Sequence, residues 1–592
     1  MHARRLGQRL ADLPQRGRAR WRRPQPGHCA GEREGLRGRG CSSGVGAHAG
    51  ARDAAVPALA RSGPRQLRPI AAKVPRRAVF VGPRTSRLGH EDRALPGCRG
   101  RSAGPPCRRT RGPGPEPAAD RFHRMVVGPS RSGIRLHGIE DGMTTTPPLG
   151  GPDTIPIAPG KIPALGHALA FRKDPINFLT SLSAIGELVK VYLGPVQTYA
   201  VTSPRVVYQL LVTEAAHFEN GRIFDKMRGF FGNGLITSNG AFHRRQRRLI
   251  QPAFSQKNIT TYTEVMRREI GELVASWQEG TVVDIQAATD DLSLRIGVAT
   301  LFKTELGTSA KETVKECLPV VLRGLLVRTL LPDVVFKLPI PGIQRLNDAE
   351  RRLRAAIGEI IRTYRADGAD HEDILSALLA ARDDETGEGM SDAEVLDEVV
   401  SLVLAATETN SSVLASFFYR LAEHPEIADR VSAEIDGVLG GRQVQYEDLT
   451  KFKHTLNALS EVLRLDMPVD MFMRRATEEV VIGETRLPAG SEFIFSIPAL
   501  HRNPDVYPDP LQFDPDRWIR RPARDLPRGS YIPFGTGGRI CVGNAFAWAE
   551  LTVVATTVLA KWRLTVAPGA KPKRVHQAST HFTSLPMALE AR

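Results

Sequence analysis

Residues 143–592 are predicted to form one large, mainly α-helical domain with a minor β component, behind an unstructured leader, residues 1–142. The charge changes at this boundary. The 592 residues carry a formal net charge of +17, yet 30 of the 81 Lys and Arg and only 10 of the 64 Asp and Glu lie in residues 1–142. The rest is therefore nearly neutral. Apolar residues recur with the helical period of 3.6 only beyond this boundary, and the leader is too rich in Arg, Gly and Pro to bury a core.

Three interpretations of the leader compete. A basic arm could bind nucleic acid or an acidic surface. A transit peptide would also be Arg-rich and poor in acidic residues, but the Pro and Gly content argues against the amphipathic helix that such peptides form. The third interpretation is upstream sequence translated from a start codon placed too early, with Met143 as the true start. We prefer the third, and we expect no nucleic-acid partner.

The elements of the domain follow in order. Residues 144–166 are rich in Pro and Gly and predict an extended lead-in. Short β-rich stretches at 189–192 and 198–202 predict a small sheet, and those at 479–482 and 492–496 a second β patch. Residues 503–533 are rich in Pro and Asp and predict turns. Amphipathic helices are predicted at Thr260–Glu279, Asp348–Asp367, Ser391–Ala422, Pro425–Leu439, Leu449–Leu465 and Ala545–Lys561.

Cysteine usage and hydropathy indicate the compartment. Of the six cysteines, only Cys317 and Cys541 lie in the domain, far apart in the sequence. This spacing argues against a disulfide framework and for a reducing compartment. No uninterrupted apolar run reaches the roughly 18 residues needed to cross a bilayer. We therefore expect a cytoplasmic protein without a membrane anchor.

A glycine-rich loop from Phe534 to Gly543 contains Cys541 and leads into the helix Ala545–Lys561. The helix N-terminus would favour a thiolate, the form that binds iron. Arg539 could bind a carboxylate. Alone, Cys541 could be no more than a small buried hydrophobe. The full spacing, Phe-x-x-Gly-x-Arg-x-Cys-x-Gly, however resembles the haem-binding signature of the cytochrome P-450 family at every fixed position. The resemblance implies that Cys541 ligates the haem iron, with Phe534, Arg539 and Gly543 around the cofactor.

Two further elements match the family in its order along the chain. Glu461 and Arg464 lie three residues apart in a predicted helix and share a face, which by itself could be an ordinary surface pair. Residues 513–518 read Phe-Asp-Pro-Asp-Arg-Trp and resemble a later family element that contains Arg517. The resemblance implies a buried, structural Glu461–Arg464–Arg517 network beside the cysteine loop.

The predicted helix Ser391–Ala422 contains the pair Glu408-Thr409. An acid followed by Thr in an apolar helix suits proton delivery to bound dioxygen, although a bent helix with a solvated Glu is the plainer interpretation. Ala406 stands where the family usually has Gly, and Asn410 where it usually has a second Thr or Ser. Both departures leave the acid–Thr pair in place, and the resemblance implies that Glu408 and Thr409 are catalytic.

A basic stretch at residues 243–248 could be a solvated face. His243 and Arg247 match the bacterial form of a family motif that contacts the haem propionates, and Arg474 matches a further propionate-binding Arg, with Arg475 adjacent. The surplus cations could face an acidic redox partner; these are Arg244, Arg245 and Arg248.

The resemblance covers about residues 156–589 and implies a single-domain monooxygenase, expected to be a monomer. It implies haem b and dioxygen, with electrons from NAD(P)H through a separate ferredoxin and ferredoxin reductase. Residues 243–254 look similar to bacterial members that oxidise sesquiterpenes, so a terpenoid is the preferred substrate, with fatty acids or polyketides as rivals. A non-catalytic haem sensor is the alternative from another class. A mostly apolar substrate pocket is expected, formed by Phe230, Phe231, Leu404, Ala405, Val469, Met471, Phe472 and Phe582.

Overall fold

The computed structural model describes residues 150–592 apart from 303–307, 332 and 577–578. The predicted leader, and with it the boundary at residue 143, lies outside the described residues. All six predicted helices are present, and their ends differ from the expected ones by at most two turns. They are α7 (Gln256–Ala275), α10 (Pro341–Asp367), α12 (Asp392–Glu423), α13 (Pro425–Leu439), α14 (Lys453–Leu465) and α17 (Asn544–Leu559).

Ten other α-helices are present in the described residues, beside several short 3-10 turns and one π-helical segment. These are α2 (Ala168–Lys173), α3 (Pro175–Ser181), α4 (Pro204–Tyr208), α5 (Arg222–Phe231), α6 (Gly240–Ile250), α8 (Ile285–Leu301), α9 (Thr308–Leu330), α11 (Ile374–Ala380), α15 (Ile497–His501) and α16 (Arg517–Arg520). The sequence pattern missed α8 because its buried residues surround the whole helix, so no apolar stripe marks it.

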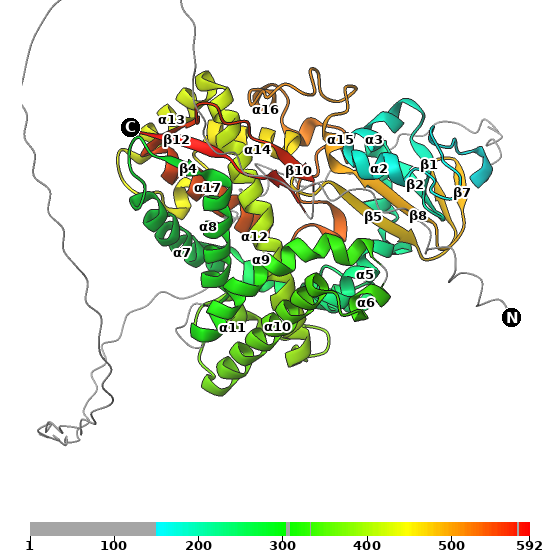
Figure 1. Ribbon diagram of the computed structural model, residues 1–592, viewed down its shortest axis with the longest axis horizontal. Coiled ribbons are helices and arrows are strands. Elements are labelled where there is room, and N and C mark those ends of the chain that lie inside the picture. Colours follow the sequence, from blue (N-terminus) through cyan, green and yellow to red (C-terminus); the bar gives the residue numbers. More distant parts are fainter. Residues whose placement is uncertain (1–149, 303–307, 332, 577–578) are drawn as a thin grey trace, which may run out of the picture. The chain divides into compact units, whose positions relative to one another are not determined.

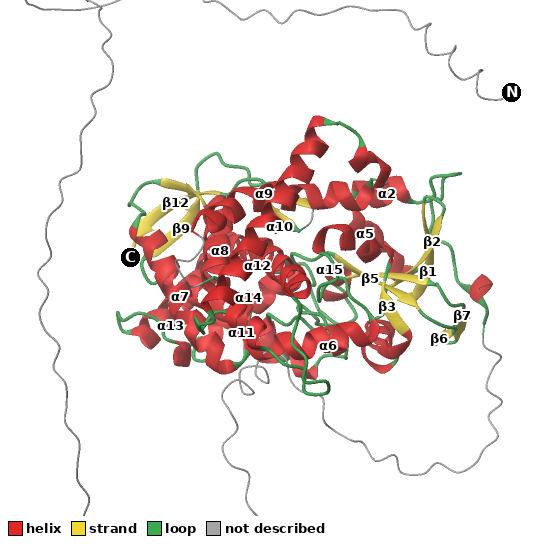
Figure 2. Ribbon diagram, turned by 90° about the horizontal axis from the view of Figure 1, so that it is seen from below, coloured by secondary structure: helices red, strands yellow, loops and turns green. Residues whose placement is uncertain are grey.

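Helix α12 lies in the middle of the helical part in both views (Figures 1 and 2). Its start is fixed by a capping box, in which the Ser391 hydroxyl accepts the Glu394 N–H and the Glu394 carboxylate accepts the Ser391 N–H. Among the described helices, only α12 is long and apolar enough to cross a membrane, and 72% of its most apolar window is buried inside the protein. That burial is typical of a core helix.

The main sheet has five strands in the order β1-β2-β8-β5-β3. They are β1 (Leu188–Leu193), β2 (Val196–Val201), β8 (Glu492–Ser496), β5 (Met471–Ala476) and β3 (Phe218–Asn220). β1 and β2 form the predicted small sheet as an antiparallel pair, with Leu188 opposite Val201. The predicted β stretch at 492–496 is β8, and it joins the main sheet and not a second patch, because it pairs in parallel with β2 and antiparallel with β5. Strand pairing between distant segments is set by tertiary structure and leaves no local pattern.

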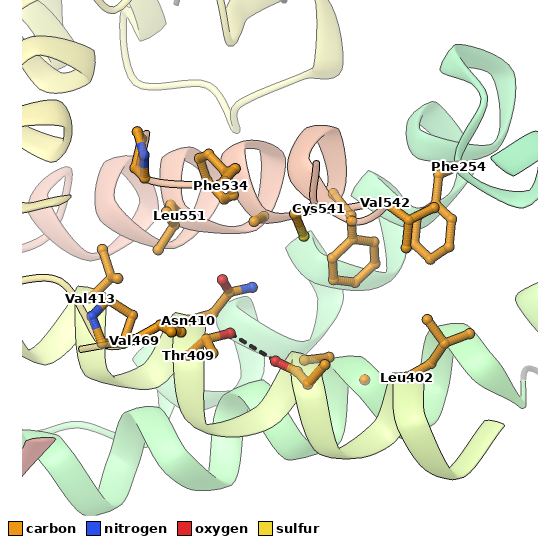
Figure 3. A pocket seen from close by; sticks show the side chains of 18 of the residues that line it. Phe254, Leu402, Thr409, Asn410, Val413, Val469, Phe534, Cys541, Val542 and Leu551 are labelled. Atoms are coloured by element: carbon orange, nitrogen blue, oxygen red, sulfur yellow. Dashed lines mark hydrogen bonds between the residues drawn. The ribbon is translucent and has the colours of Figure 1, made fainter. Parts of the chain in front are cut away.

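Three smaller sheets are formed by the remaining strands. One contains β4 (Val282–Asp284), β12 (Pro586–Ala591) and β9 (Trp562–Val566), and the two others pair β6 (Val480–Ile482) with β7 (Thr485–Leu487) and β10 (Arg574–His576) with β11 (Thr580–Phe582). The main sheet lies to one side of the helical part (Figure 1). The cysteine loop and the start of α17 lie within the helical part, facing α12 (Figure 3).

Candidate active site

A large cavity lies between the cysteine loop and α12 (Figure 3). Cys541 lines one wall, and Thr409 and Asn410 of α12 line the opposite wall. The cavity volume is about 330 Å³, and the space is partly open to solvent. Pockets for a single small molecule usually measure about 300–1,000 Å³, so the cavity has the size of a small-molecule pocket.

The cysteine loop owes its shape to glycines at two positions. Gly535 and Gly537 both have a φ of 71°, a left-handed conformation that side chains disfavour. At Gly537 a Cβ would also lie 2.1 Å from the Leu211 carbonyl oxygen, so only glycine fits. The Cys541 N–H donates to the Phe534 carbonyl at 2.8 Å and closes the loop. The Phe534 ring packs 5.9 Å from that of Trp548, which attaches the loop to α17.

The thiol of Cys541 is deep in the protein but accessible from the cavity. Burial raises its pKa, while the Gly543 N–H and the Arg247 guanidinium act in the opposite direction. The predicted helix N-terminus is present, since α17 begins at Asn544. In the protein alone burial outweighs the Gly543 N–H and the Arg247 guanidinium, and a bound metal cation would favour the thiolate.

Four basic side chains meet at one edge of the cavity, and each of the four was predicted to be near a cofactor carboxylate. Burial, together with Arg539, Arg247 and Arg474, lowers the pKa of His243 to about 3. Arg539 donates to the Ser238 carbonyl and the Asn239 side chain, and Arg247 donates to the Ile540 carbonyl of the cysteine loop. In the described part of the chain, no carboxylate lies within ion-pair distance of these three arginines. Arg474 is buried and Arg247 and Arg539 are half-buried, and such unpaired cations fit an anionic ligand.

The two adjacent arginines of β5 have different surroundings. Arg475 pairs with Glu219 at 2.7 Å and with Asp225 at 2.9 Å. Arg474 is only 7% exposed, and burial, with a contribution from Arg539, lowers its pKa to about 9. Because Arg475 is already neutralised, Arg474 is the residue left for a ligand.

The surplus cations of α6 are largely used within the chain. Arg245 pairs with Glu394 at 2.7 Å, and Arg248 with Asp383 at 2.9 Å. Arg244 is exposed and has no ion-pair partner among the described residues. The predicted partner-facing set is therefore reduced mainly to Arg244.

On α12, Thr409 lines the cavity and Glu408 does not. The Thr409 hydroxyl donates to the Ala405 carbonyl at 2.8 Å, which leaves its lone pairs for a donor in the cavity. Burial raises the pKa of Glu408, and its carboxyl accepts a hydrogen bond from Ser579. The acid therefore lies behind the cavity wall, next to β11.

Comparison with known proteins assigns the family. The sequence profile of the family described as cytochrome P450 (here written P-450) matches residues 156–589. Cyclooctat-9-en-7-ol 5-monooxygenase of Streptomyces melanosporofaciens is 40% identical over 74% of this chain and 96% of its own. Pentalenene oxygenase of Streptomyces avermitilis is 36% identical over 74% of this chain and 97% of its own. The chain belongs to the cytochrome P-450 family. It is a cytochrome P-450 monooxygenase.

The crystal structure of the cytochrome P-450DA haem domain shares the fold, with a TM-score of 0.67 over 75% of this chain and 98% of that chain, at 24% identity. The predicted fold class and family are thereby confirmed.

The structure also brings together the predicted network of Glu461, Arg464 and Arg517, which is centred on helix α14. Glu461 and Arg464 are fully buried and joined by two hydrogen bonds, of 2.7 and 2.9 Å, and Arg517 lies 3.4 Å from Glu461. Arg464 also donates to the carbonyl oxygens of His501, Pro510 and Gln512. The network thus fixes the turn-rich segment that precedes the cysteine loop.

Of the eight predicted pocket residues, Ala405, Val469 and Phe472 line the cavity. The other five are not among its lining residues. Leu404 is 3% exposed in the core, the rings of Phe230 and Phe231 pack against each other at 5.1 Å, and Phe582 packs against Tyr419. Met471 packs against a small core around the main sheet. Leu404 points away from the cavity because adjacent residues on a helix point about 100° apart, and its neighbour Ala405 faces the cavity.

Sequence analysis missed several cavity residues, namely Gly297, Thr300 and Leu301 of α8 together with Phe254, Met467 and Phe546. No local pattern marks them, since the cavity gathers segments that are distant in sequence. It also missed Glu550, a fully buried acid in α17. The signal was available: Glu550 is the single acidic residue in an otherwise apolar run.

Proposed function

We propose that this cytochrome P-450 binds haem b through Cys541 and hydroxylates an apolar small molecule of the terpenoid class. One observation carries the proposal: the Cys541 thiol faces the Thr409 hydroxyl across a cavity that has unpaired cations at its edge. A haem with two propionates requires a thiol ligand, an adjoining cavity and cations that no carboxylate neutralises.

The residues that would hold the haem divide into two groups. Cys541 would ligate the iron, on a loop fixed by Phe534 and Gly543. The propionates would be bound by the cations Arg247, Arg474 and Arg539 and by His243 as a neutral hydrogen-bond donor. When bound, the haem supplies dioxygen activation, with electrons that we propose come from NAD(P)H through a ferredoxin and its reductase.

The chain would contribute proton delivery and exclusion of water. The Thr409 hydroxyl, held by Ala405, can accept a hydrogen bond from a donor in the cavity. Glu408 lies one residue earlier with a pKa raised by burial, so it can exchange protons nearer to neutral pH than a solvated carboxyl can. We propose that protons pass from Glu408 to the region of Thr409.

The apolar walls support an apolar substrate. Leu402, Ala405, Val469 and Phe472 provide hydrocarbon surface with few polar anchors. The two relatives described above carry names of terpenoid-oxidising enzymes, which favours a terpenoid over a fatty acid or polyketide.

The test is the difference spectrum of the reduced protein with carbon monoxide. Wild-type protein is expected to show the Soret shift of thiolate-ligated haem, and Cys541→Ala is expected to lack it. Wild-type protein that binds haem without this shift would contradict thiolate ligation. Oxygen uptake that depends on NAD(P)H and a surrogate ferredoxin would separate an enzyme from a haem sensor. Spectral titration with terpenes, fatty acids and polyketides would then rank the substrate classes.

A further inference from the structure

Glu550 is an acid that the proposed mechanism does not use. It is fully buried in the apolar helix α17. Its carboxyl accepts hydrogen bonds from the Ser293 hydroxyl of α8 at 2.8 Å and from the Asn410 Nδ2 of α12 at 2.7 Å. A buried carboxyl that joins three helices is costly unless its hydrogen bonds are made, so its surroundings are specific.

Asn410 connects this acid to the cavity. It lines the cavity directly after Thr409, and its Nδ2 donates to Glu550 (Figure 3). The threonines of the cavity wall are held differently, because Thr300 and Thr409 both donate to carbonyls of their own helices. Among these three polar side chains, the orientation of Asn410 alone is set by an acid from another helix.

We propose that Asn410 is a hydrogen-bond acceptor in the cavity wall for an O–H donor, and that Glu550 is the positioning residue that turns the Asn410 amide oxygen toward the cavity. Because Nδ2 is used by Glu550, Oδ1 is the amide atom left for the cavity. The inference rests on the proposed function, since the O–H donor would be a water that accompanies oxygen chemistry or a hydroxyl of the substrate.

The positioning depends on the charge of Glu550. Burial raises its pKa to about 7, and the hydrogen bonds from Ser293 and Asn410 act in the opposite direction. No charged side chain of the packed helices α7, α8, α12 or α14 contributes to this shift. The ionised carboxylate can only accept hydrogen bonds and therefore holds Nδ2. The protonated acid can donate to Oδ1, which would turn Nδ2 toward the cavity, so the polarity of the wall would change near neutral pH.

The test compares Asn410→Leu, Glu550→Gln and the double variant, with Thr300→Val as the matched control. The control removes a cavity hydroxyl that bonds its own helix. The carboxyl infrared band is recorded against pH, and is expected to titrate in the wild type and to disappear in Glu550→Gln. Binding of a terpene and of its alcohol, and product formed per NAD(P)H, are then measured. Loss of one neutral hydrogen bond predicts an effect of about 2- to 12-fold in Asn410→Leu.

Two results support the proposal and identify the donor. A loss of affinity for the alcohol alone identifies a substrate hydroxyl. Unchanged affinities with less product per NAD(P)H identify water. In either case Glu550→Gln should remove the pH dependence of the affected quantity, and its effect should not add to that of Asn410→Leu.

Other results would overturn it. The first is full additivity of the effects of Asn410→Leu and Glu550→Gln. The second is an unchanged pH profile in Glu550→Gln, and the third is an effect of Thr300→Val as large as that of Asn410→Leu. If Asn410→Leu fails to fold, the pH profile of Glu550→Gln still decides. The proposed function fails separately, when the wild type lacks the thiolate Soret shift with carbon monoxide, whatever the infrared band shows.

Discussion

Replacing Arg474 with Met should have opposite effects on the haem-free and the haem-bound protein. Arg474 is buried without a carboxylate partner among the described residues, and its pKa is lowered to about 9. Each pKa unit corresponds to about 1.4 kcal/mol, so the charge costs the haem-free fold a few kcal/mol. The carbonyl of Met473 and the side chain of Asn220 accept hydrogen bonds from the guanidinium and offset part of this cost. Arg474→Met should therefore stabilise the haem-free protein by about 1–3 kcal/mol.

In the haem-bound protein the same change removes a cation from a propionate. A hydrogen bond to a charged group contributes about 1.5–3 kcal/mol. Haem affinity should therefore fall about 10- to 150-fold. Denaturant unfolding of the haem-free protein measures the first effect, and the rate of haem transfer to an excess of a haem-scavenging protein measures the second.

Arg475→Met is the matched control, one residue along the same strand. Arg475 is 26% exposed and its pairs with Glu219 and Asp225 contribute about 0.2–1 kcal/mol each. This variant should lose that stability and keep its haem affinity. If Arg474→Met destabilises the haem-free protein, or if haem transfer is as slow as in the wild type, the assignment of Arg474 to a propionate is refuted.

Three further predictions follow from the site. Glu461→Gln leaves two buried arginines without their carboxylate and should lower the free energy of unfolding, measured with denaturant, by about 3–5 kcal/mol. Loss of the exposed Arg430–Asp516 pair should lower it by under about 1 kcal/mol. Equal losses in the two variants would contradict the buried network. Burial lowers the pKa of His501 to about 3, and its Nε2 accepts the N–H of Ile532. Histidine in the unfolded chain has a pKa of about 6.5, so the contribution of neutral His501 to the free energy of unfolding should be fully present above that pH. It should fall by up to about 1.4 kcal/mol per pH unit as the pH drops toward 3, and His501→Gln should flatten this slope. Thr409→Ala should keep the carbon monoxide spectrum and lower product per NAD(P)H by about tenfold or more, and unchanged yield would remove Thr409 from proton delivery.

The sequence determined the parts that depend on local spacing. The glycines, Arg539 and Cys541 are fixed within one loop, and only glycine fits the left-handed backbone at Gly537. Helices α7, α10 and α13 were predicted because each buries one face and exposes the other. Glu461 and Arg464 were predicted to pair because they lie three residues apart on one helix. These features are properties of short segments.

The tertiary structure decided which side chains face the cavity. α12 is buried on most of its surface, so no exposed face marks its orientation in the sequence. The fold turns Ala405 and Thr409 into the cavity and leaves Leu404 and Glu408 outside it. It also chooses between two adjacent arginines, since Glu219 and Asp225 pair with Arg475 and leave Arg474 unpaired. Contacts between distant segments, such as Asn410 with Glu550 140 residues later, have no local pattern and arise only when the helices pack.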